Sequence, residues 1–258
     1  MNKFSLGIFL DIHPEGREKW QQNIDFINSV EGINHLEIWL ESNLTDDDIQ
    51  FLQSKLSKYQ LIIHGPFLNL SLLSDHSSVN QTSLEIFKNA IDTSVKLNAK
   101  LITVHAGKYP KFFDKQKVFS IFEENFSELT NYANNKIIVT TENMDSSHGA
   151  HISFPTVVDF SDIKKITPNV KFTLDIGHCI LESSDLYYFL KTYKDDIKNI
   201  HIHNAFKNGK SHFGLQLPGD LNTKKIINFL NEIDYQGFLT IEVLTNEDKI
   251  ESVKLIQS

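Results

Sequence analysis

The chain has 258 residues, of which 40% are hydrophobic and 22% are charged, an ordinary globular composition with enough residues for a substantial core. The formal net charge is −8 and Arg17 is the only arginine, which argues mildly against extensive recognition of a phosphate backbone, although lysine is plentiful. Cys179 is the only cysteine, which rules out an internal disulfide and fits a reducing compartment. The N-terminal segment is too short and too polar for a signal peptide, and no stretch approaches the roughly 20 apolar residues of a membrane span. We therefore expect a cytoplasmic protein with no membrane partner.

Short apolar runs alternate with segments of helical periodicity along the whole chain. The runs predict buried strands near residues 4–10, 35–39, 60–64, 100–105, 136–142, 170–175, 198–203 and 237–243. Helical spacing is clearest in 83–97 and 118–133, and Thr45 before an acidic turn marks another helix start. Eight strand–helix units predict a single-domain α/β protein over 1–258, a (β/α)8 barrel. An open doubly wound sheet is disfavoured because no glycine-rich phosphate loop follows the first run.

Side chains that can bind a metal lie at or near the C-terminal ends of six of these runs. They are His64, His105, Glu142, Asp175, His178, His201 and Glu242. A (β/α)8 barrel gathers such groups at one edge, and imidazole with carboxylate suits a divalent ion such as Zn or Mn. Each residue alone has a structural explanation, but one shared site explains them together. Glu142, Asp175, His201 and Glu242 could converge on one ion, and His64 with His105 could form a second subsite bridged by Glu142. We expect one or two ions per chain.

Other polar residues near the predicted edge are weaker candidates. His203 lies two residues after His201 on the same strand face, so it could bind the metal or lie in the substrate pocket. The remaining histidines are expected at the surface or at a strand edge (His13, His35) or in loops (His76, His148, His151), of which His148 and His151 lie close enough to the fifth strand to touch substrate. Trp39, with Glu37 and Glu41 beside it, flanks the pocket or packs between barrel and helix.

At these residues the chain resembles the xylose-isomerase-like TIM-barrel superfamily, which includes endonuclease IV (AP endonuclease family 2) and sugar or sugar-phosphate isomerases and epimerases. The matching stretches cover nearly the whole chain: HGPFLNL at 64–70, LITVHAG at 101–107, TENM at 141–144, LDIGH at 174–178, HIHN at 201–204 and IEV at 241–243. Separately each stretch is weak, and together they are specific for the superfamily.

The resemblance implies two different ligand arrangements. Similarity to endonuclease IV implies one metal on His64, His105 and Glu142, a second on Glu142, Asp175, His201 and Glu242, and a third involving His178 and His212. Lys210 stands where an Asp of that third site is expected, so the third metal is doubtful. Similarity to ketose epimerases implies one ion on Glu142, Asp175, His201 and Glu242. The two glutamates would then act as acid and base, and His178 and Lys207 would contact substrate oxygens.

The function favoured by this pattern is a metal-dependent isomerase or epimerase of a small sugar or sugar phosphate, working by proton transfer through an enediolate. Glu142 and Glu242 are the predicted catalytic pair. The predicted substrate-binding residues are His178, His203, Lys207, His212 and Glu37, and Lys207 or Lys210 could hold a substrate phosphate. The alternative is an endonuclease IV-like phosphodiesterase acting at abasic DNA; it is disfavoured by the single arginine and the absence of a basic stripe. A homo-oligomer is left open.

Overall fold

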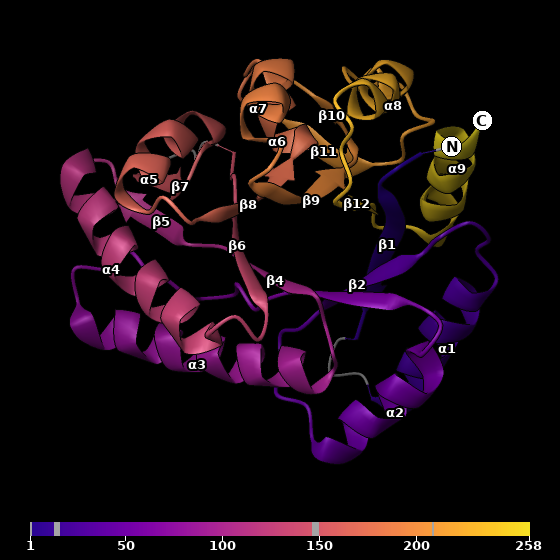
Figure 1. The fold of residues 1–258 in the computed structure, drawn as a ribbon, viewed down its shortest axis with the longest axis horizontal. Coiled ribbons are helices and arrows are strands. Elements are labelled where there is room, and N and C mark those ends of the chain that lie inside the picture. Colours follow the sequence, from indigo (N-terminus) through magenta and orange to yellow (C-terminus); the bar gives the residue numbers. More distant parts are fainter. Residues whose placement is uncertain (1, 13–15, 146–149, 208) are drawn as a thin grey trace.

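Eight parallel strands close into a barrel with the helices outside it (Figure 1). The structure is a computed structural model that describes residues 2–12, 16–145, 150–207 and 209–258. In the order of their pairing, the barrel strands are β1 (Ser5–Asp11), β12 (Phe238–Ile241), β9 (Ile197–Ile202), β8 (Lys171–Asp175), β6 (Ile138–Glu142), β4 (Leu101–Val104), β3 (Gln60–His64) and β2 (His35–Trp39). The predicted (β/α)8 barrel is confirmed, and each strand coincides with one of the predicted apolar runs.

The helices cover the outside of the barrel between successive strands. They are α1 (Arg17–Asn28), α2 (Asp46–Leu56), α3 (Ser77–Lys96), α4 (Lys115–Ala133), α5 (Phe160–Ile166), α6 (Ile176–Leu181), α7 (Leu186–Tyr193), α8 (Thr223–Glu232) and α9 (Asn246–Gln257), with a 3-10 turn at Val157–Asp159. The predicted helix start at Thr45 is confirmed, since Thr45 and Asp48 form a reciprocal capping box at α2. Helices α3 and α4 contain the two periodic segments, and their apolar faces are buried.

Polar side chains fill much of the barrel interior, whereas apolar side chains pack between strands and helices. Thr103, Thr140 and Thr173 are fully buried, and their hydroxyl oxygens lie 2.8–3.2 Å from one another. Because each hydroxyl can both donate and accept, this ring satisfies itself without water. A hydrogen-bonded polar floor therefore closes the barrel below its carboxyl ends.

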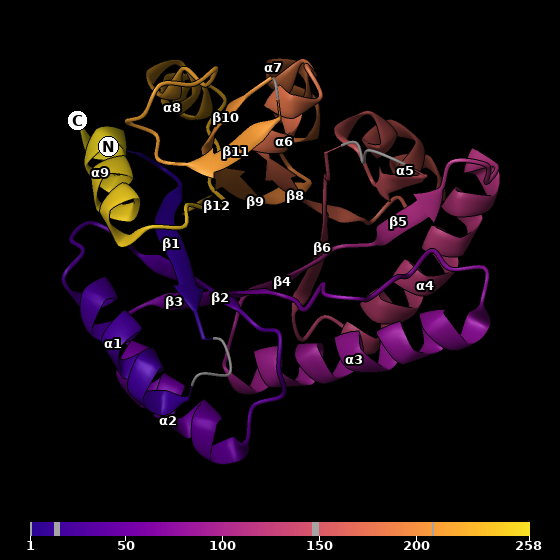
Figure 2. The same ribbon diagram turned by 180° about the vertical axis from the view of Figure 1, so that it is seen from behind.

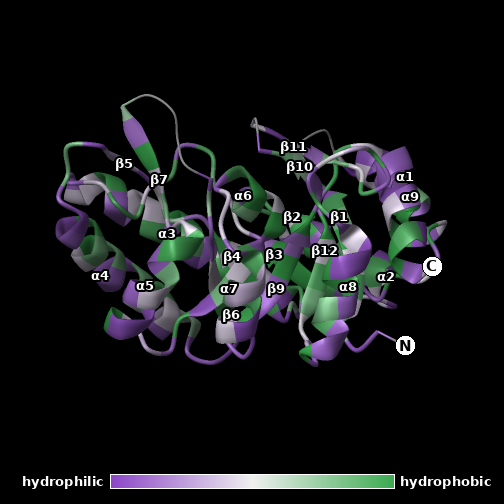
Figure 3. Cartoon of the chain, turned by 90° about the horizontal axis from the view of Figure 1, so that it is seen from above, coloured by the Kyte–Doolittle hydropathy of each residue, from purple (hydrophilic) through white to green (hydrophobic). Residues whose placement is uncertain are grey.

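Two small antiparallel sheets of two strands each, which the sequence patterns do not predict, rise at the carboxyl end of the barrel. Strand β5 (Gly107–Pro110) pairs with β7 (His151–Phe154), and β10 (Asn204–Phe206) pairs with β11 (Lys210–Phe213). Figure 2 shows β10 and β11 in front of the barrel, and Figure 3 shows both small sheets on the same end of the molecule. Their strands have only three or four residues, too few for a clear alternation of polar and apolar side chains. His151 accordingly begins a strand and does not lie in a loop.

His35 differs from its expected position at the surface or at a strand edge. Its ring is fully buried at the start of β2, where Nδ1 lies 3.1 Å from Ser5 Oγ and Nε2 lies 2.9 Å from Thr240 Oγ1. The ring packs directly over Gly7, where a Cβ atom would come within 2.4 Å of Nε2. His13 and His148 lie outside the described residues. Among the residues that are described, no helix is long and apolar enough to cross a membrane.

Candidate active site

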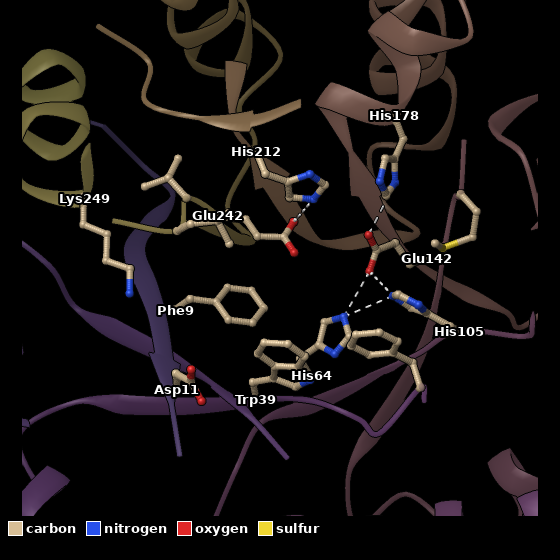
Figure 4. Close-up of a pocket in the computed structure, with 14 residues that line it drawn as sticks. Phe9, Asp11, Trp39, His64, His105, Glu142, His178, His212, Glu242 and Lys249 are labelled. Carbon is tan, nitrogen blue, oxygen red and sulfur yellow. Dashed lines mark hydrogen bonds and ion pairs between the residues drawn. The ribbon is translucent and has the colours of Figure 1, made fainter. Parts of the chain in front are cut away.

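A pocket of about 340 Å³ opens among the carboxyl ends of the barrel strands. Figure 4 shows Glu142, His64, His105 and His178 gathered on one side of it and Glu242 with His212 beside them. Glu142 and Asp175 are the last residues of β6 and β8, whereas His105 and Glu242 come directly after β4 and β12. Parallel strands bring these ends to one edge, which is why residues far apart in sequence meet here.

Four side chains on adjacent strands form the central cluster of possible metal ligands. Glu142, Asp175, His201 and Glu242 each offer one atom, and these atoms all lie within 4.8 Å of one another. His201 Nδ1 lies 3.3 Å from Glu142 Oε1 and 3.2 Å from Glu242 Oε2. Ligands bound at metal distances of about 2.1 Å are themselves separated by about 3.0 to 3.4 Å, so the spacing fits a shared cation.

Two atoms of this cluster are buried polar atoms without a hydrogen-bond partner among the described residues. They are His201 Nδ1 and Glu242 Oε2. A buried polar atom that makes no hydrogen bond is costly, and a bound ion is one of the accepted explanations for it. The donor set, one imidazole and three carboxylates, suits Mn, Zn or a related divalent ion. The residues present therefore fit a divalent cation.

The Glu37 carboxylate contacts Nε2 of His201, the ring nitrogen that faces away from the cluster of possible ligands. His201 Nε2 lies 3.0 and 3.1 Å from the two Glu37 oxygens, and Asn199 Nδ2 donates to Glu37 Oε2 at 2.8 Å. Carboxylate bound to the far nitrogen of a histidine is the usual way to fix the orientation of a metal ligand. Glu37 is fully buried and does not line the pocket, so the structure places it away from the position expected of a substrate contact. Glu37 lies two residues before the end of β2, and its side chain is therefore deeper in the barrel than the residues that line the pocket.

A second cluster consists of His64, His105 and Glu142. His64 Nδ1 donates to the Gly65 carbonyl at 2.9 Å, which leaves the Nε2 lone pair of the neutral ring directed into the cluster. There Nε2 lies 3.1 Å from His105 Nε2 and 3.6 Å from Glu142 Oε2. His105 Nε2 lies 3.1 Å from the same Glu142 oxygen. Glu142 thus offers one oxygen to each cluster, as a bridging ligand would.

The third group contains Asp175, His178, His203 and His212. His178 Nδ1 donates to the Asn143 carbonyl at 2.8 Å, so its Nε2 is free to face the pocket. The backbone N–H of His212 donates to His203 Nδ1 at 3.0 Å, which places the ring proton on Nε2, 3.1 Å from Asp175 Oδ2. With both nitrogens engaged, His203 positions Asp175 and is fully buried below the pocket. His203 is absent from the pocket lining, where a substrate contact was expected, but it remains one of the possible metal ligands of this third group.

His212 reaches this group from β11 through an unusual backbone conformation. Its φ is +60°, in the left-handed region that side-chain-bearing residues seldom adopt. The conformation brings its ring against that of His203, with 4.0 Å between the ring centroids, and its Nε2 to 3.8 Å from Glu242 Oε2. The β10–β11 hairpin thus places the His212 side chain in the lining of the pocket.

The electrostatics of the cluster favour positive charge. Burial opposes ionisation of Glu142, but His201 and His105 outweigh it and hold the pKa of Glu142 well below its usual value. Burial likewise disfavours the charged form of His178, yet Asp175 and Glu142 raise its pKa to about 9. The carboxylates thus raise the pKa of His178 and His201, whereas burial prevails at His105 and His212 and lowers their pKa. A divalent cation would meet the same demand of the carboxylates for positive charge.

The pocket lining lacks the two lysines that were expected near the substrate and includes Trp39. Lys207 is exposed on the β10–β11 hairpin and does not line the pocket, and neither does Lys210. Trp39 does line it and stacks on Phe67, with 5.4 Å and 9° between the rings. Sequence patterns alone do not reveal the apolar wall or two charged lining residues, Asp11 at the end of β1 and Lys249 of α9. A signal for Lys249 existed, since it shares the buried helix face of Val253 and Ile256 at i+4 and i+7.

Comparisons with known proteins agree with this architecture. The family model described as xylose isomerase-like TIM barrel matches residues 24–257. An uncharacterised protein of Methanocaldococcus jannaschii, MJ1311, is 25% identical over 230 residues, which cover 83% of this chain and 75% of that protein. Among solved structures, a D-tagatose 3-epimerase-like protein has a TM-score of 0.85 at 21% identity, covering 98% of this chain and 96% of the other. An AP endonuclease, family 2, from Brucella melitensis has a TM-score of 0.70 at 15% identity, covering 94% and 93%. At these identities the structural matches establish the fold alone.

Proposed function

Since the chain belongs to the xylose isomerase-like TIM barrel family, we propose that it is a divalent-metal-dependent isomerase or epimerase of a small sugar or sugar phosphate. The observation that carries the proposal is the placement of Glu142 and Glu242 in one pocket. They stand at the two ends of an arc of four adjacent strands, β6, β8, β9 and β12, with Asp175 and His201 between them. A substrate bound at this arc has one carboxylate on each side.

The roles of the residues follow from this arrangement. A divalent cation held by the four side chains would supply polarisation of a carbonyl group and stabilise the negative charge that develops beside it. One of Glu142 and Glu242 removes a proton from the carbon next to the carbonyl, and the other returns a proton. Because the two carboxylates belong to one cluster, their titration is a shared property. His178 and His212 line the same pocket and bind substrate oxygens.

A second candidate function is metal-dependent phosphodiester hydrolysis of the endonuclease IV type. The observation that favours it is the overlap of three groups of possible ligands, which share Glu142 and Asp175. Clustered ions are suited to stabilising both the attacking and the leaving oxygen of a phosphate ester. The net charge of −8 argues against a polyanionic partner, so this function ranks second.

The test uses the metal-loaded protein and the variants Glu142→Gln and Glu242→Gln, with Glu251→Gln, at a partly exposed position of α9, as a matched control. Ketoses and ketose phosphates are incubated in deuterated water, and both deuterium incorporation at carbon and product formation are measured. We expect both site variants to fall below about a hundredth of the wild-type rate, since each loses a ligand and a base, while the control keeps full rate. A rate above about a tenth of wild type in either site variant would refute the double role.

The metal content of the purified protein separates the two candidate functions. About one ion per chain favours the isomerase or epimerase, because only the central cluster would then be filled. Two or three zinc ions per chain, together with incision of DNA that contains an abasic site, would favour the phosphodiesterase.

A further inference from the structure

Lys249 is a buried lysine whose ammonium group has no hydrogen bond or ion pair within the described part of the chain. The residue is 8% exposed, although it lies in the first turns of the terminal helix α9. Lysine at such a helix position normally extends into solvent and keeps its charge hydrated. In Figure 4 the side chain instead reaches from α9 toward Phe9 and Asp11, at the edge of the active-site pocket.

The ammonium group lies where two cavities adjoin. Lys249 lines the active-site pocket, and it also lines a second cavity of about 320 Å³ between β1, α1 and α9. Phe9, Asp11 and Leu244 are common to both linings, so the two spaces meet at Lys249. The second cavity carries one further lysine, Lys19, which is exposed at its outer side. A ligand longer than the active-site pocket would extend past Lys249 into this space.

Burial of this cation without a partner has a cost that the fold alone does not explain. Desolvation lowers the pKa of Lys249, and the nearby Asp11 carboxylate only partly opposes that effect. A buried ammonium group is tolerated when it is paired, and an anionic ligand supplies the missing pair. Among the described residues that line the junction, Lys249 and Lys19 carry positive charge and Asp11 carries negative charge, next to a strongly acidic cluster of possible metal ligands.

We propose that Lys249 binds an anionic group of the substrate, a phosphate ester or a carboxylate, at the end remote from the reacting carbons. This inference rests on the proposed function for the nature of the reaction, but not for the binding of the anion. The reacting carbons of the substrate then lie at the arc of β6, β8, β9 and β12. Its anionic group lies on the other side of Phe9, next to β1 and α9. Lys249 is then the residue that selects phosphorylated or acidic sugars over neutral ones.

The test is calorimetric binding to the metal-loaded protein, which needs no turnover. The ligands are D-fructose, D-fructose 6-phosphate and D-glucuronate, and the proteins are wild type, Lys249→Met and the control Lys254→Met. Lys254 lies on the same helix but is paired with Glu251 at the surface. We expect an anionic sugar to bind wild type and control at least about tenfold more tightly than D-fructose, and this ratio to fall to about one in Lys249→Met. A gain with only one of the two anionic sugars identifies that anion as the ligand. An unchanged ratio in Lys249→Met overturns the inference.

Thermal unfolding separates a binding role from a structural one. Without ligand, Lys249→Met should unfold at a higher temperature than wild type, because methionine fills the same space without an unpaired charge. A lower unfolding temperature would assign the lysine to the fold and would count against the inference. If no sugar binds wild type or either variant, the proposed function loses its support. The anion site is then tested by itself, by adding inorganic phosphate to the metal-free proteins. Phosphate that raises the unfolding temperature of wild type but not of Lys249→Met supports the anion site, and an equal effect on both refutes it.

Discussion

Replacing Glu37 by Gln tests whether the carboxylate that contacts His201 Nε2 raises the affinity of the proposed metal centre for a cation. The change removes the charge that faces His201 Nε2 at 3.0 and 3.1 Å and keeps the shape of the side chain. Two unit charges about 3 Å apart attract by about 5 kcal/mol at an effective dielectric of about 20. Only part of a unit charge develops on the ring when Nδ1 binds a cation, so a fraction of this energy is lost. We expect metal affinity to fall by about 10- to 100-fold, or about 1.4 to 2.8 kcal/mol.

The assay is competition for Zn or Mn between the protein and a chelating indicator of known affinity. Glu41→Gln is the matched control, because Glu41 lies just after β2 and accepts hydrogen bonds from Trp39 Nε1 and from the backbone of Phe67 instead of contacting His201. The control should bind metal as wild type does. If Glu37→Gln binds metal within about twofold of wild type, Glu37 does not tune His201 and the reasoning fails. Far-ultraviolet circular dichroism of the metal-free variants checks that both remain folded.

Three further outcomes are expected. His64→Ala should keep the ion of the central cluster and lose any second ion, as measured by elemental analysis; unchanged content above one ion per chain would mean that His64 is no ligand. Burial lowers the pKa of His35 to about 3, so the unfolded state takes up this proton first and stability falls as the pH drops below 6.5. In His35→Gln the free energy of unfolding should therefore depend on pH less steeply between pH 5 and 6, by about 1.4 kcal/mol per unit, in urea titrations; an identical slope would refute this. Trp39 fluorescence should change when a substrate analogue binds, and an unaffected signal would leave Trp39 with packing alone.

The sequence is sufficient to predict the barrel and its ring of candidate ligands for one physical reason. In a parallel barrel the end of every strand arrives at the same edge, so Glu142 and Asp175 need only end their apolar runs to meet. The distances between them depend on the barrel itself, and the pairing of Asp175 with His201 across β8 and β9 fixes that part of the geometry. Residue type and strand position therefore carry most of the information.

The depth of a side chain within the barrel cannot be predicted from the sequence. His35, Glu37 and Trp39 alternate on one strand, so all three share a face, but only Trp39 at the strand end lines the pocket. Which level each residue occupies depends on register, such as the pairing of Glu37 with Phe9 across β2 and β1. That register comes from long-range pairing, which no local pattern encodes. For the same reason the sequence alone suggests a substrate contact for Glu37, whereas in the structure Glu37 supports His201 from below.

The two sides of the pocket have different chemistry, and this division bears on specificity. The arc from β6 to β12 carries the candidate ligands, whereas Phe9, Trp39 and Phe67 form an aromatic wall associated with β1, β2 and the segment after β3. Aromatic faces suit the C–H surface of a sugar, and in the proposed function they would orient it with its reacting carbons toward the carboxylates. Lys249 enters from α9 on the side of the wall. Because the groups for proton transfer and those for selection come from different elements, a change at Lys249 can alter which sugar binds and leave the ligand set intact.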